Sequence, residues 1–482
     1  MTRLYTSLRR GSALVYGLVI MTVVLILLTS IISFVASQIK YALTIHTREQ
    51  SFQIAEAGIH FYKWYLAHNT DGRTTSQIQA FWTGGTAYGV DTLYEAEYFD
   101  PGGGAVGKYQ ITVTPPETGS TAVTVRSVGI SYKDADAPRT IEVRFRRPSW
   151  SEFIVLSNAI TRFGEGTETF GPIHSNLGIR FDGLAHNLVT SSVASYNDPD
   201  HVGGDELGVH THVNVPPATG VNDTFRPAEA AGVTPLPARP DVFEGGRQLL
   251  VPTVDFNGVL GDLNYIKSEA IAGTNGSRYF DDDHQGRHII LKTDGTFDIR
   301  TVQSFVSSTN EIKNYSGGWA TYPIPDEGVI FVENNVWLEG TINGKRATIV
   351  AANLESSALK DIYIGKDIRY TNYDCSDMLG IIGQSDVMIY ENSETDLRID
   401  GALLAQTHRV GRPNYGQSDH KDIITIYGAI VSNQRYGFAW TNGVQNWGYT
   451  TRDLLYDNNL LYCPPPYFPV GTQYEMDLWE EK

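Results

Sequence analysis

The sequence predicts a mainly β protein with one long N-terminal α-helix, a small antiparallel sheet and a large β-rich region. Three observations lead to this fold class. Residues 12–70 keep an apolar helical pattern, and no proline occurs before Pro101. Alternating strand patterns follow between residues 106 and 147. A short motif centred on glycine then recurs along the remaining chain, as in folds whose strands stack coil upon coil.

Length and composition agree with this class. The chain has 482 residues, more than a single hydrophobic core usually organises. Its 27 tyrosines and 47 glycines suit strands and turns. The net charge of −17 argues against a nucleic-acid partner. We interpret the one basic cluster as a solvated strand face and the start of a linker: Arg139, Arg144, Arg146 and Arg147.

The N-terminus predicts a membrane anchor. Residues 1–11 form a basic leader without acidic residues, and no charged side chain occurs from Gly11 to Ile39. As a helix, Ala13–Ala36 would be about 36 Å long, enough to cross a bilayer and longer than the apolar region of a secretory signal. Since the positive charge precedes this span, we expect a single-pass protein of the cytoplasmic membrane with its N-terminus inside and its body extracytoplasmic.

The same helix continues beyond the membrane span. Apolar residues recur at helical spacing on one face: Ile45, Phe52, Ala55, Ile59, Tyr62 and Leu66. The helix is expected to stop near Asn69–Gly72. Two interpretations are open, namely an anchor followed by a stalk, or a helix that packs laterally against copies of itself in a filament.

Two segments carry a family resemblance. RRGSALVYGLVIMTVVLILL and the later QSFQIAEAGIHFY together resemble the N-terminal region of PilX-type minor pilins of type IV pili. The resemblance covers about the first 65 residues. It implies cleavage by prepilin peptidase between Gly11 and Ser12, and other pilins or pilus assembly proteins as partners.

One position departs from the major pilins, which carry Glu at the fifth mature residue. Here that residue is Tyr16. The departure favours a minor or initiating component, or an uncleaved anchor, over a main filament subunit.

Residues 71–150 are predicted to form the small antiparallel unit. Strand patterns surround Ile111, Val125 and Ile141, and a change of phase predicts a β-bulge near Arg126–Ser127. A helix followed by such a three-stranded meander resembles the pilin body plan.

Residues 151–482 are predicted to form an irregular right-handed parallel β-helix, with a β-sandwich as the alternative. LRIDGALLAQ (397–406) and ITIYGAIVSN (424–433) match in residue type almost throughout, and their amides Gln406 and Asn433 are expected to form a ladder. Related segments share the central glycine at Gly171, Gly340, Gly401 and Gly428. The Pro- and Gly-rich stretch 195–300 is predicted to be a loop insertion.

The C-terminal stretch from Trp440 to Trp479 is dense in aromatic residues. We expect it to cap the end of the β-helix, because a solenoid needs a covered end. A stacking surface for sugars or a host ligand is the alternative.

The two cysteines, Cys375 and Cys463, lack zinc-site spacing and form a possible disulfide outside the cytoplasm. We expect no metal and no cofactor. The acidic run Asp281–His284 lacks calcium-loop spacing. His201, His210 and His212 have no acid at a recognised metal-site spacing and fall in a loop-like region.

The sequence therefore predicts a non-enzymatic, pilin-like surface protein, a minor or tip component of a type IV pilus or pseudopilus acting in assembly or adhesion. One alternative is a membrane-anchored enzyme that acts on polysaccharide through Asp396 and Asp400, which share a strand face. Another is a plain anchored surface protein.

Overall fold

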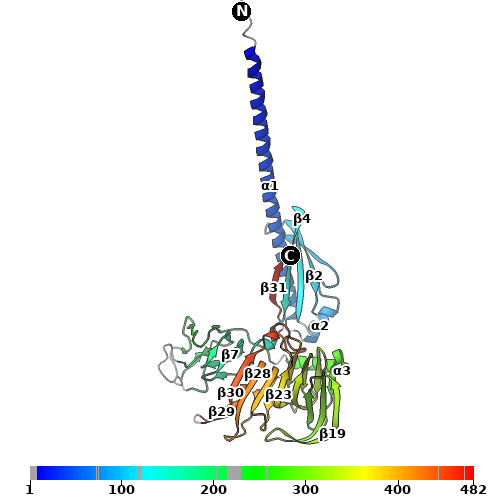
Figure 1. The fold of residues 1–482 in the computed structure, drawn as a ribbon, viewed down its shortest axis with the longest axis vertical. Helices are drawn as coiled ribbons and strands as arrows, with labels where there is room; N and C mark the ends of the chain where they lie inside the picture. The colour runs from blue at the N-terminus through cyan, green and yellow to red at the C-terminus, as the bar shows by residue number, and fades with distance from the viewer. Residues whose placement is uncertain are drawn as a thin grey trace, which may run out of the picture.

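The computed structural model describes residues 8–482 except for 72, 74, 117–120, 202, 214–228, 257–258, 443–444 and 472. Its dominant feature is helix α1 (Leu8–Thr70), 63 residues long, which projects far beyond the rest of the molecule (Figure 1). The predicted helix of residues 12–70 is thus present as one element. Residues 1–7 of the predicted leader lie outside the described residues.

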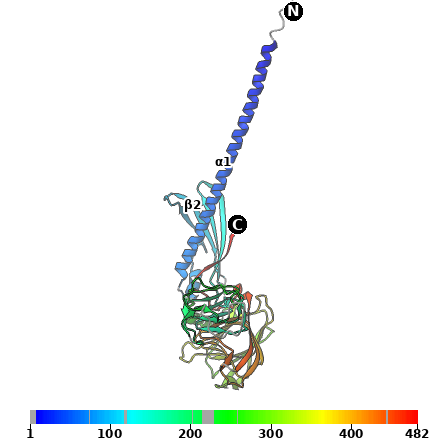
Figure 2. The same ribbon diagram turned by 90° about the vertical axis from the view of Figure 1, so that its left-hand side faces the viewer.

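A five-stranded antiparallel sheet packs against the second half of α1 (Figure 2). Its order is β1-β2-β3-β4-β31. The strands are β1 (Tyr94–Phe99), β2 (Ala105–Thr114), β3 (Ala122–Ser131), β4 (Asp134–Arg146) and β31 (Glu475–Glu481). The sequence predicted the three central strands but neither β1 nor β31. Since β31 is the C-terminal strand and pairs with β4, everything between them is an insertion into this sheet.

The predicted bulge near Arg126–Ser127 is wrong. The pairing of β2 with β3 runs without a shift through both residues. The change of phase has another cause, because Ser127, Gly129 and Ser131 are the side of β3 that faces the helix. Small residues occupy this buried face, while the larger Val128 and Ile130 lie half-buried on the other.

The inserted body is made of stacked parallel coils. Consecutive strands alternate between ladders, and each strand pairs in parallel with a strand one coil away. The first ladder contains, in order, β16 (Arg278–Phe280), β20 (Gly328–Val332), β22 (Arg346–Ala351), β24 (Met378–Gly383), β26 (Asp396–Ala405), β28 (His420–Ser432), β5 (Val155–Ser157), β8 (Ile173–Ser175), β11 (Val189–Ser191) and β15 (Arg247–Gln248).

Two further ladders complete the coils. One contains β17 (Gly286–Leu291), β21 (Asn335–Ile342), β23 (Ile362–Tyr370), β25 (Val387–Ile389) and β27 (Val410–Gly411). The other joins β23, β26 and β28 to β30 (Asn446–Tyr456), β7 (Glu168–Phe170) and β10 (Leu184–Ala185). This pairing is that of a parallel β-helix.

The order of coils differs from the order of the chain. The chain enters at β5 in the middle of the stack and winds outward to β15. It then reaches the opposite end, where helix α3 (Val259–Ala272) packs on β16 and β20, and winds back until β28 pairs with β5. Two segments far apart in sequence therefore form neighbouring coils.

The repeat predicted from sequence corresponds to the strand register between two neighbouring coils. In the β26–β28 pair Leu397 lies opposite Ile424 and Gly401 opposite Gly428, as the matching of segments 397–406 and 424–433 predicts. A Cβ on Gly428, whose φ is +149°, would clash with the Gly401 carbonyl oxygen. The amide ladder forms from Asn433 but not from the Gln406 side chain, because Asn433 Nδ2 donates to the backbone carbonyl of Gln406 at 2.7 Å. It continues through Asn158 and Asn176.

The loop insertion predicted over 195–300 is wrong in its second half. That part contains α3, β16, β17 and the start of an antiparallel hairpin formed by β18 (Thr296–Val306) and β19 (Glu311–Pro323) on β17. Its apolar positions are buried in the same core as the coils. The first half holds only the short strands β12 (Ser195–Tyr196), β13 (Glu206–Leu207), β14 (Val209–His210) and β15 among its described residues.

Candidate functional site

The long helix divides into two halves with different surroundings. Every described side chain from Ala13 to Leu43 is exposed, including large apolar ones such as Leu25 and Phe34. Among the described residues, α1 is the one helix that is long and apolar enough to cross a membrane. An exposed apolar surface of this size is unfavourable in water and needs lipid or another protein to cover it.

The second half packs on the sheet. Ala55, Ile59, Tyr62 and Leu66 of the predicted apolar face are buried, and Phe52 is partly buried. Ile45 is 50% exposed, because it lies before the first residue that the sheet buries, Thr47.

Small residues bring this half of the helix very close to β3. A Cβ on Gly129 would clash with the carbonyl oxygen of Ser51 and the nitrogen of Ala55. Ser131 lies two residues after Gly129 on β3, and its backbone N–H donates to Ser51 Oγ at 3.3 Å. The helix is therefore fixed on the sheet by backbone contact, so that its exposed half extends as a rigid continuation.

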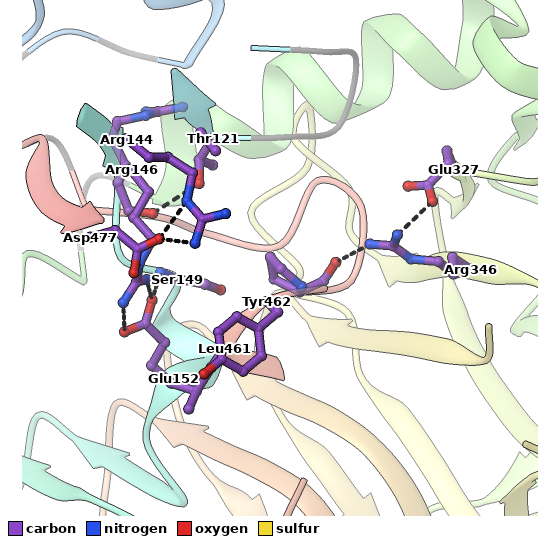
Figure 3. A pocket seen from close by; sticks show the side chains of 13 residues that line it. Thr121, Arg144, Arg146, Ser149, Glu152, Glu327, Arg346, Leu461, Tyr462 and Asp477 are labelled. Carbon is purple, nitrogen blue, oxygen red and sulfur yellow. Dashed lines mark hydrogen bonds and ion pairs between the residues drawn. The ribbon is translucent and has the colours of Figure 1, made fainter. Parts of the chain in front are cut away.

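An arginine-rich junction joins the sheet to the β-helix (Figure 3). Arg144 Nε donates to Asp477 Oδ2 at 2.6 Å, and Arg146 pairs with both Asp477 and Glu152. Burial lowers the pKa of Arg146, but the hydrogen bonds and negative charges of Glu152 and Asp477 together outweigh burial, so that the pKa is raised. The basic cluster thus holds the returning strand β31 in place. Our prediction of a solvated face is wrong for Arg147, which is 7% exposed.

The returning chain is fixed to the β-helix by a disulfide. Cys375 and Cys463 are bonded, with their Cα atoms 5.9 Å apart. Beyond Cys463, the Pro464 carbonyl accepts a hydrogen bond from Arg346 Nη2 at 2.9 Å, and Phe468 packs over Gly380. The segment therefore covers the outer face of β22 and β24, and neither strand lies at an end of the first ladder.

This placement corrects the predicted aromatic cap. The C-terminal segment covers a side of the β-helix, and helix α3 contacts its terminal coils. Trp447, Tyr449 and Tyr456 belong to strand β30 and are buried. Tyr462 is 74% exposed at the junction, and Trp479 on β31 is 41% exposed.

The carboxylates considered for catalysis have different environments. Asp396 is exposed at the start of β26, whereas Asp400 is fully buried. Asp400 accepts hydrogen bonds from Arg398 Nε at 2.7 Å and from the Tyr373 hydroxyl at 2.8 Å. Both carboxylate oxygens of Asp400 therefore accept hydrogen bonds from neighbouring groups of the β-helix. The acidic run Asp281–His284 is a surface turn whose carboxylates contact nearby basic and amide groups.

The sequence analysis connected these histidines to no acidic residue, but in the structure they lie next to two. His210 and His212 are buried beside Asp198 and Glu206, and His201 Nδ1 lies 3.4 Å from Glu206 Oε1. The acids were missed because only the chain reversal between β12 and β13 brings Asp198 to Glu206. The alternation of His210 and His212, with Glu206 four residues before His210, was the available signal.

No family model matches the chain, and no curated protein matches it. Among solved structures, the competence-associated pilin ComZ from Thermus thermophilus is similar over 90% of this chain and 97% of that chain, with 12% identity and a TM-score of 0.30. A likeness at that level carries no argument about this protein.

Proposed function

We propose that this chain is a membrane-anchored, pilin-like, non-enzymatic protein, a minor or tip component of a type IV pilus or pseudopilus. The observation that carries the proposal is the division of α1. Its first half is apolar and exposed along its whole described length, and its second half is fixed to an antiparallel sheet. The resemblance of the N-terminal segments to PilX-type minor pilins points the same way.

The position of the β-helix supports a terminal role. The body enters between β4 and β31, at the sheet end away from the free half of α1 (Figure 1). A domain of this size next to the sheet would crowd neighbouring subunits in a helical lattice. At a tip it would be displayed outward, where it would serve assembly or adhesion.

Processing of the N-terminus tests the proposal. The chain is expressed in membranes with and without a prepilin peptidase, and the mature N-terminus is read by mass spectrometry. We expect a new terminus at Ser12 that depends on the peptidase and is lost in Gly11→Trp. An unprocessed terminus under both conditions would contradict the proposal and leave a plain anchored surface protein.

A further inference from the structure

Four side chains able to bind a metal ion meet in the N-terminal part of the β-helix. Asp198, Glu206, His210 and His212 each place one ligand atom within 4.8 Å of the others, and all four residues are buried. His210 and Glu206 have fully buried side chains. The inference drawn from them is independent of the proposed function.

Local structure explains the convergence. Strands β12 and β13 pair antiparallel, which brings the residues following Tyr196 back toward Glu206. Strand β14 pairs with β9 (Ile179–Phe181), placing His210 beside Arg180 in the register. His210 and His212 are two residues apart, and the centroids of their rings lie 5.1 Å from each other.

The polar atoms in this cluster are poorly satisfied. Neither ring nitrogen of His210 makes a hydrogen bond of good geometry with the described residues, and neither does Asp198 Oδ2. His210 Nε2 instead lies 3.5 Å from Asp198 Oδ2 and contacts Glu206 Oε2. Groups buried to this degree normally make well-formed hydrogen bonds, and a ligand shared by these atoms would give them a partner.

The charges point to a cation. Asp198 and Glu206 are two buried carboxylates, and burial of a charge is unfavourable without an opposite charge beside it. Arg180 Nη1 is 3.8 Å from Asp198 Oδ2, but its Nε is engaged by Asp182 at 2.6 Å. A divalent cation between the carboxylates and imidazoles would balance these charges and give His210 and Asp198 Oδ2 a partner.

We propose that Asp198, Glu206, His210 and His212 bind one Zn²⁺ ion. Two imidazoles with two carboxylates make a four-coordinate nitrogen and oxygen set that suits Zn²⁺, whereas Ca²⁺ and Mg²⁺ favour oxygen ligands alone. All four positions come from protein, which is typical of a structural site. The ion would fasten residues 198–212 onto the coil containing β9.

Neighbouring groups are placed to orient the ligands. The His212 backbone N–H donates to Asp182 Oδ1 at 2.8 Å, and Asp182 is in turn held by Arg180. The Asp200 backbone N–H donates to Asp198 Oδ1 at 2.9 Å, leaving Oδ2 toward the cluster. Contacts of this kind fix the orientation of metal ligands.

Metal titration of the full chain in detergent tests the site. After treatment with a chelator, Zn²⁺ binding is measured by calorimetry, bound metal by elemental analysis, and coordination by the visible spectrum of the Co²⁺-loaded protein. We expect one Zn²⁺ per chain, a tetrahedral Co²⁺ spectrum and a higher unfolding temperature with metal. His210→Gln should weaken binding by more than about 100-fold.

The matched control is His186→Gln. His186 also contacts two glutamates, with Nε2 2.7 Å from Glu168 Oε1 and Nδ1 against Glu244, but both carboxylates are largely exposed. This variant should bind Zn²⁺ like the wild type. If His210→Gln does not fold, Glu206→Gln replaces it. Failure of the wild type to bind stoichiometric Zn²⁺, a Co²⁺ spectrum of octahedral form, or unchanged binding in the cluster variant would overturn the proposal.

Discussion

The backbone N–H of Trp150 donates to the carbonyl of Pro469, 3.0 Å away, where the chain leaves the antiparallel sheet and where it returns. Next to it, Gly471 N–H donates to the Pro148 carbonyl at 2.8 Å. The two connections between sheet and β-helix thus run side by side. Each body also has its own hydrophobic core, and the two clusters share no residue.

This arrangement predicts that the β-helix folds by itself. Residues 149–470, expressed alone, should give a soluble, cooperatively unfolding domain, because their core is closed and their ends are adjacent. Circular dichroism and thermal unfolding check this. As a control, a version ending at residue 427 lacks the end of β28, the strand that pairs with β5, and should not unfold cooperatively. An unfolded 149–470 fragment would contradict the separation of the two cores.

Gly129→Ala should loosen the helix from the sheet. The new methyl group would meet the backbone of α1 at Ser51 and Ala55, which cannot move without shifting the helix. We expect a loss of about 1–3 kcal/mol in the free energy of unfolding, the usual cost of overpacking. Urea unfolding followed by tryptophan fluorescence measures it.

The control for that substitution is Gly318→Ala in hairpin β18–β19. No atom beyond its two chain neighbours lies within 4 Å of a Cβ placed there. This variant should unfold like the wild type. Equal stability of the two variants would show that α1 does not approach β3 as closely as described.

Loss of the disulfide should free the returning segment. Cys375 and Cys463 are separated by 88 residues, and the chain-entropy model gives such a bond about 4 kcal/mol of stabilisation. Cys375→Ser combined with Cys463→Ser should lower the unfolding temperature and expose residues near Tyr462 to protease. Reduced wild type should behave like the double variant. A variant as stable and protease-resistant as the oxidised protein would contradict this role.

Acid should destabilise the β-helix partly through Glu339. Burial raises the pKa of this carboxyl, but hydrogen bonds from His288 at 3.0 Å and Lys366 at 2.8 Å outweigh it and the pKa is lowered. A carboxyl with a depressed folded-state pKa contributes stability above its unfolded pKa, and this is lost as pH falls through the folded pKa.

Unfolding temperatures measured between about pH 6 and about pH 3 check that prediction. Glu339→Gln should be less stable than the wild type at the upper end of this range, and the difference should shrink toward the acidic end. Glu355→Gln alters a carboxylate that is 82% exposed and should leave the profile unchanged. A difference that does not vary with pH would contradict the assignment.

Local patterns in the sequence were sufficient to predict several elements of the fold. The α1 helix follows from periodicity and the lack of proline, and the register of β26 on β28 follows from matching residues around Gly401 and Gly428. These features depend on neighbouring residues or on a repeated shape. Strand β31 carries a weak pattern and is defined by its pairing with β4, so it could not be found locally.

Other features depend on which coils become neighbours. The pairing of Ser432 with Ser157 joins the end of the body to its beginning, an order that no local signal encodes. The same holds for the candidate metal site, where His210 was visible in the sequence but Asp198 becomes its neighbour only through folding. Arg144 and Arg146 of β4 looked solvated because their partner Asp477 lies at the far end of the chain.

The proposed function requires that α1 carry this chain into a filament. The most direct measurement is recovery of the protein with filaments sheared from cells that contain the pilus machinery, compared between wild type and Gly11→Trp. We predict that the wild type appears in the sheared fraction at low abundance and that the variant remains in the membrane. Wild-type protein confined to the membrane, while other filament subunits are recovered, would contradict the claim.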